Sequence, residues 1–108
     1  MSRPASLASL LAPTILVGCA GVAAIDTGRL LQAYVDCNGA ASRRQAVSSG
    51  DPLDLAAAAE VSCGDRRAAL ERAYRRTVGE AEARRLIASV KSAAFATNAT
   101  TIIMARGG

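Results

Sequence analysis

Residues 37–63, CNGAASRRQAVSSGDPLDLAAAAEVSC, decide the fold because they place two cysteines at equal distances from a turn. The stretch Ser48-Ser49-Gly50 has the composition of a turn. Asp51 follows as an N-cap acid, Pro52 suits the first helical position, and Asp54 adds an acid in the first turn. The sequence therefore predicts an antiparallel helical hairpin that reverses direction at this turn.

The two cysteines of this hairpin, Cys37 and Cys63, each stand 13 residues from Gly50. Both lie on the apolar stripes of their helices, so we expect them to face each other at the same height. A disulfide needs Cα atoms ~5.5–6 Å apart, which requires small neighbouring side chains. Nearby alanines meet this need (Ala33, Ala40, Ala41 and Ala59). We predict a Cys37–Cys63 disulfide, the alternative being two buried, reduced cysteines in a cytosolic protein.

The chain after residue 25 shows the periodicity of apolar residues that is typical of helices. It contains no long alternation of apolar and polar residues, which would indicate strands. A first helix is expected from Asp26 or Thr27 to about Val47, and the second should stop at Gly64. The expected apolar stripes are Leu30, Tyr34, Cys37 and Ala41 in the first helix, and Leu55, Ala56, Ala59 and Cys63 in the second. These patterns predict an all-α fold, a small helical bundle built on the disulfide-linked hairpin.

Two further helices complete the expected bundle. Asp65 can cap a third helix that ends at Gly79, and a fourth begins at about Glu80. Their apolar positions are Ala69, Leu70, Ala73 and Tyr74 in the third, and Ala83, Leu86, Ile87, Val90 and Ala94 in the fourth. The uncharged segment 97–104 leaves three alternatives open: an extension of the fourth helix, a short strand, or an apolar tail for a partner.

Composition limits what this chain can do. It has 108 residues, enough for one domain, and its apolar content of 51% consists largely of alanine. Its net charge is +4, but the basic residues alternate with nine acids along the helices. This pattern is typical of solvated helix faces with i,i+4 ion pairs, and aromatic residues are sparse. We therefore expect no nucleic-acid partner.

The N-terminus has the composition of an export signal. Arg3 is the only charged residue before Asp26, and an apolar run extends from Leu7 to Val17. It leads into Leu16-Val17-Gly18-Cys19, which resembles the lipobox of bacterial lipoprotein precursors. That resemblance implies cleavage between Gly18 and Cys19 and attachment of lipid to Cys19. It also implies a membrane-anchored location in the cell envelope, facing the periplasm.

The lipobox divides the chain into three parts. Residues 1–18 become the signal peptide, 19–26 the lipidated tether, and 27–108 the helical domain. Ala20 in place of aspartate resembles lipoproteins sorted to an outer membrane, where the cell has one. The chain has three cysteines, so lipid on Cys19 would leave two that can pair in a disulfide. An even number of cysteines is what an exported, disulfide-bonded protein is expected to have.

Three other interpretations of the N-terminus remain open. A secretory signal cut after Val22-Ala23-Ala24 would discard Cys19 and release a secreted helical protein. The 21 uncharged residues from Ala5 to Ile25 are long enough for an uncleaved transmembrane helix, although they contain Pro13, Gly18 and Gly21. The third alternative is a buried helix in a cytosolic basic protein.

Most catalytic chemistry is disfavoured by composition. The chain has no histidine, so Ser-His-Asp and Cys-His systems are excluded and the commonest zinc ligand is missing. Asp51 and Asp54 are explained by their positions at a helix start. We expect no catalytic, metal or cofactor site and no small-molecule substrate. The expected function is a non-enzymatic interaction module with a protein partner in the envelope.

Overall fold

The computed structural model describes residues 26–107, and this part of the chain is helical. Residues 26–45 form the first described helix, followed by α2 (Pro52–Val61), α3 (Gly64–Val78) and α4 (Glu80–Ala105). No strand occurs in this range. The all-α prediction is confirmed.

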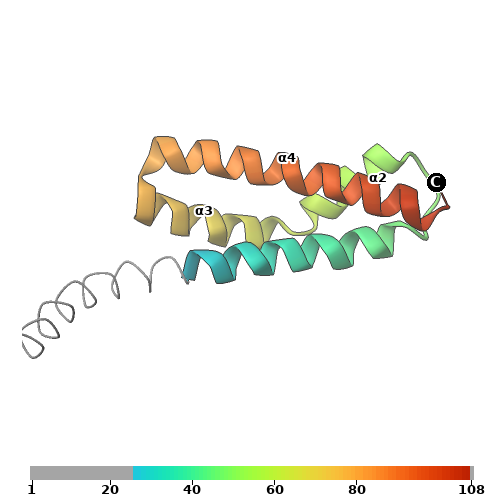
Figure 1. Cartoon of the computed structure of the whole chain (residues 1–108), viewed down its shortest axis with the longest axis horizontal. Helices are drawn as coiled ribbons and strands as arrows, with labels where there is room; N and C mark the ends of the chain where they lie inside the picture. The colour runs from blue at the N-terminus through green and yellow to red at the C-terminus, as the bar shows by residue number, and fades with distance from the viewer. Residues whose placement is uncertain (1–25, 108) are drawn as a thin grey trace, which may run out of the picture.

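The helices form a bundle that runs up, down and up. Helix 26–45 runs in one direction, α2 and α3 return end to end, and α4 runs back beside them (Figure 1). The turn between α3 and α4 lies at the same end of the bundle as residue 26, while the 46–51 turn lies at the other end (Figure 1). The predicted antiparallel hairpin is therefore present, and α4 completes a third layer.

The start of α2 follows the predicted capping chemistry. The carboxylate of Asp51 accepts a hydrogen bond of 2.8 Å from the backbone N–H of Leu53, and Pro52 begins the helix. Gly50 precedes them at φ 135°, a conformation that a side chain would disfavour. These three residues reverse the chain where the sequence predicted it.

The boundary between α2 and α3 differs from the prediction. α2 ends at Val61, and Gly64 opens α3 instead of ending the second helix. Asp65 lies in the first turn of α3 and is not its cap, since Cys63 holds that position without a side-chain cap. Backbone hydrogen bonds from Cys63 N to Glu60 O and from Arg67 N to Cys63 O bridge the boundary. The regular helix is therefore interrupted between Val61 and Gly64, but no loop separates α2 from α3.

The other end of α3 agrees with the sequence. Gly79 has φ 87° and separates α3 from α4 as a single residue. The 97–104 segment continues α4, which settles the three alternatives for it in favour of a helix. Its inner face is buried through Asn98, Ala99 and Ile102.

The core is narrow because its side chains are small. Tyr34, Leu70 and Ile102 are the largest fully buried apolar residues, and alanines fill much of the remainder. The predicted inward positions are largely confirmed. Buried among them are Tyr34, Ala41, Ala56, Ala59, Cys63, Leu70, Ala73, Tyr74, Ala83 and Ile87.

Arg106 connects the C-terminal end of α4 to the 46–51 turn by hydrogen bonds. Its guanidinium donates to the backbone carbonyls of Ser48 and Gly50, the latter at 2.8 Å. A longer contact of 3.5 Å reaches the carbonyl of Ala46, just past helix 26–45. The guanidinium group therefore pairs with backbone carbonyls of the 46–51 turn, which lie outside the helices.

Candidate functional site

The predicted disulfide joins helix 26–45 to the α2–α3 boundary. Cys37 and Cys63 are bonded, and their Cα atoms lie 5.9 Å apart. Cys63 is buried, whereas Cys37 is half-buried and borders a shallow hollow with Arg44 and Arg66. The bond fixes the register of the two antiparallel layers, and the alternative of two reduced cysteines is not what the structure shows.

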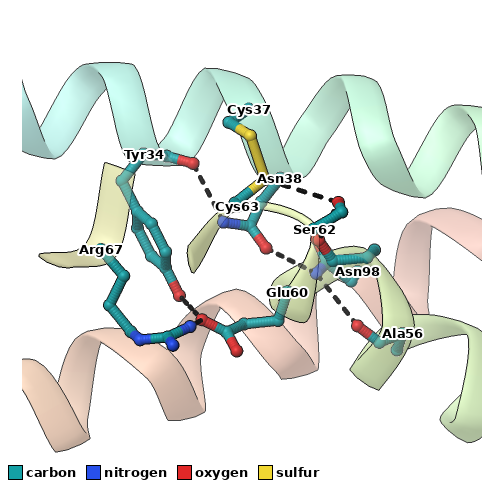
Figure 2. Close-up of polar contacts among 10 residues, drawn as sticks. Tyr34, Cys37, Asn38, Ala56, Glu60, Ser62, Cys63, Arg67 and Asn98 are labelled. Atoms are coloured by element: carbon teal, nitrogen blue, oxygen red, sulfur yellow. Dashed lines mark hydrogen bonds and ion pairs between the residues drawn. A yellow bond between two sulfur atoms is a disulfide. The ribbon is translucent and has the colours of Figure 1, made fainter. Parts of the chain in front are cut away.

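A buried polar cluster lies beside the disulfide. The hydroxyl of Tyr34 donates a 2.9 Å hydrogen bond to Glu60 Oε2, and the guanidinium of Arg67 pairs with the same oxygen (Figure 2). Tyr34 has no exposed surface. Burial, followed by the neighbouring Glu60 carboxylate, raises the pKa of the Tyr34 hydroxyl. The cluster links helix 26–45, α2 and α3 around one carboxylate.

A second buried contact joins helix 26–45 to α4. Asn98 Nδ2 donates to Asn38 Oδ1 at 2.8 Å and to the carbonyl of Ala56 at 3.3 Å, while Asn38 Nδ2 donates to the carbonyl of Tyr34 (Figure 2). Across residues 26–107, every buried side-chain nitrogen or oxygen has a hydrogen-bond partner. The two clusters therefore stabilise a specific packing and present no free buried polar group to a ligand.

An apolar groove follows the seam between helix 26–45 and α4. Its volume is about 370 Å³. Leu31, Val35 and Gly39 line one side, and small or apolar residues of α4 line the other (Val90, Ala93, Ala94 and Thr97). Val35 is 51% exposed although it belongs to this apolar surface. Small side chains on both sides leave room for apolar groups of another molecule.

No family model, curated protein or solved structure matches this chain. The candidate site is therefore assigned from its own residues. The predicted lipidation site Cys19 and the cleavage position after Gly18 lie outside the described residues. Those predictions continue to rest on the sequence.

Two further features of residues 26–107 concern metal binding and membranes. No group of three or more histidine, cysteine, aspartate or glutamate side chains is placed to hold a metal ion in this range. One helix there, α4, is long and apolar enough to cross a membrane by length and composition. One face of α4 is already packed inside the bundle, through Ala83, Ile87, Asn98, Ala99 and Ile102.

Sequence reasoning missed the polar part of the core. Asn38 lies four residues after Tyr34 and three before Ala41, so it falls on the predicted apolar stripe. Asn98 lies four residues after Ala94, so it falls on the predicted apolar stripe of α4. A polar residue in such a position is a signal for a buried partner. Glu60 meets the same criterion, since it lies four residues after Ala56 on the apolar stripe of the second helix.

Proposed function

We propose that this chain is a bacterial lipoprotein that holds a helical interaction module at a membrane surface of the cell envelope. The observation that carries the proposal is the Cys37–Cys63 bond. Disulfides persist in exported proteins and are rare in the cytosol. This bond accounts for both cysteines of the body, which leaves Cys19 as the single remaining thiol, within the lipobox-like Leu16-Val17-Gly18-Cys19.

The anchor follows from the physical chemistry of acyl chains. Each buried CH₂ group contributes ~0.8 kcal/mol, so one chain anchors only marginally and two or more anchor stably. A diacylated Cys19 would hold the soluble bundle on the bilayer without a spanning helix. Because the described helix includes Asp26, only the six residues 20–25 separate the lipid-bearing Cys19 from it.

The groove between helix 26–45 and α4 supports the interaction part of the proposal. It is open to solvent, apolar and lined by small side chains, among them Gly39, Ala93 and Ala94. These properties suit the apolar side chains of one helix of an envelope protein, because small residues permit close approach. No group in the described clusters is arranged as a nucleophile with a base, so a non-enzymatic role is the better-supported proposal.

The N-terminal peptide of the mature protein tests the anchor. We expect its mass to correspond to an acylated Cys19, and metabolic labelling with an alkyne fatty acid to be lost in Cys19→Ala. The Cys37→Ala/Cys63→Ala variant is the matched control and should retain the label. A native protein that still begins with Met1 and has a free Cys19 thiol would overturn the proposal.

The second candidate is an integral membrane protein with an uncleaved N-terminal transmembrane helix. The charge-free stretch from Ala5 to Ile25 favours it, since 21 residues can span ~30 Å of hydrocarbon. Membrane association would then survive Cys19→Ala, and no acyl label would appear. A secreted protein cut after Ala24, or a cytosolic basic protein, would instead be recovered in a soluble fraction.

A further inference from the structure

One end of the bundle faces the place where the tether leaves it. We call this the tether-side end and define it as residues 26–30 together with 71–85. The disulfide sets Cys37 and Cys63 at one height. From there helix 26–45 extends about 16 Å back to residue 26, while α3 extends about 22 Å to its last residue. The α3–α4 turn is therefore the outermost part of this end (Figure 1).

Arginines are concentrated at the tether-side end. It contains six arginines and four acidic residues, a net charge of +2. Three of these arginines are held by local ion pairs, Arg75 with Glu71 and Glu80, Arg84 with Glu80, and Arg85 with Glu82. The other three, Arg29, Arg72 and Arg76, are exposed and form no ion pair with any acidic residue in the described range.

The outermost point of this end is apolar. Val78 is 46% exposed at the end of α3, and the next residue, Gly79, has open space where a side chain would project. Arg76, which forms no ion pair with an acidic residue of the described range, precedes this point in the last turn of α3. An exposed aliphatic side chain beside an unpaired guanidinium group suits the boundary between lipid headgroups and acyl chains.

We propose that the tether-side end rests on the anionic phospholipid headgroups of the bilayer that carries the anchor, with Val78 at the contact. The proposal takes the position of that bilayer from the lipidation of Cys19. Cys19 and Asp26 are seven Cα–Cα steps apart, which span at most about 25 Å when fully extended, so a lipid at Cys19 keeps this end within reach of the headgroups. Guanidinium groups bind phosphate through paired hydrogen bonds, and Arg29, Arg72 and Arg76 are available for it.

Tryptophan fluorescence can locate the contact because the chain contains no tryptophan. We compare Val78→Trp with Val47→Trp, a residue that is 90% exposed in the turn at the opposite end. Each protein, isolated from membranes, is reconstituted in vesicles of phosphatidylcholine with or without phosphatidylglycerol. The Val78→Trp emission should shift to shorter wavelength only with phosphatidylglycerol, and the Val47→Trp emission should not shift in either vesicle.

Charge variants then test the role of the arginines. Each basic residue near an anionic surface strengthens the association about fivefold, so Arg72→Gln/Arg76→Gln should lower the ratio of docked to undocked protein about 30-fold. The matched control is Arg43→Gln/Arg44→Gln, which removes the same charge from exposed residues of helix 26–45. Circular dichroism of both variants checks that they fold.

The outcomes separate this proposal from the lipidation of Cys19. If the protein is acylated but its Val78→Trp emission is the same with and without phosphatidylglycerol, the headgroup contact is overturned. The anchor is then left intact. An equal effect of the two double variants also overturns it, because net charge alone would then explain the binding. An unmodified Cys19 in protein that still shows the Val78→Trp shift overturns the anchor and leaves the headgroup contact standing.

Discussion

Asn98 Nδ2 lies 2.8 Å from Asn38 Oδ1, although the two residues are 60 positions apart in sequence. This hydrogen bond crosses the seam between helix 26–45 and α4, directly beneath the apolar groove that both residues line. Both side chains are almost completely buried. A buried polar pair tolerates few alternative packings, since a shifted helix would leave each group without a partner. The pair therefore specifies the register between the first and last layers.

The two asparagines should contribute to stability as a coupled pair. Asn98→Ala leaves Asn38 Oδ1 and the carbonyl of Ala56 without their donor, and we expect a loss of about 1–3 kcal/mol in the free energy of unfolding. The Asn38→Ala/Asn98→Ala variant should lose less than the two single losses combined. Urea unfolding of the four proteins measures this coupling. Thr100→Ala, on the exposed face of α4, is the control, and strict additivity would argue against the pair as a register device.

The disulfide fixes the other register, between helix 26–45 and the α2–α3 layer. Cys37→Ala/Cys63→Ala should lower the free energy of unfolding by about 3 kcal/mol, because the open loop gains entropy in the unfolded chain. Urea unfolding of wild type before and after treatment with dithiothreitol provides an independent comparison. We expect the reduced wild type and the variant to unfold at similar urea concentrations. An unchanged midpoint in both would show that the bond contributes little to stability.

Two glycines should respond to alanine with opposite signs. Gly79 has φ 87° and ψ 173°, a region that side chains strongly disfavour, so Gly79→Ala should destabilise the protein by about 1–3 kcal/mol. Gly28 is an exposed helical residue with open space around a Cβ, and Gly28→Ala should stabilise it by about 0.5–1 kcal/mol. Thermal unfolding of both variants measures the difference. A loss of stability in both would contradict the backbone argument.

Local patterns predicted most of the fold because they depend on nearby residues. The turn at Gly50, the cap at Asp51 and the stop at Gly79 each follow from the conformation that one residue type permits. The disulfide also followed, since equal spacing from a turn places two helical positions at one height. These features needed no knowledge of distant contacts.

The errors arose where tertiary contacts override local preference. Gly64 was expected to end a helix, but Cys63 is held in the core by its disulfide and the hydrogen bonding continues across the boundary. The polar clusters were missed because Glu60 and Asn98 find their partners only after the layers pack. A search for polar residues on apolar stripes would have found the positions but not their pairing.

Tyr34 should make the bundle sensitive to alkaline pH. Burial and the Glu60 carboxylate raise the pKa of its hydroxyl in the folded protein, whereas the unfolded chain releases this proton near pH 10. The folded state therefore binds more protons above that pH. Its stability is intact below about pH 10 and falls as the pH rises further.

Tyr34→Phe provides the test of this pH dependence. The variant loses the hydrogen bond to Glu60 and should be less stable at pH 8 by about 1 kcal/mol. Because phenylalanine does not ionise, its urea midpoint should fall less steeply than that of wild type between pH 9 and about pH 11. Burial also raises the pKa of Tyr74, which both proteins retain, so a smaller slope should persist in the variant. Parallel pH profiles would show that Tyr34 does not control the alkaline transition.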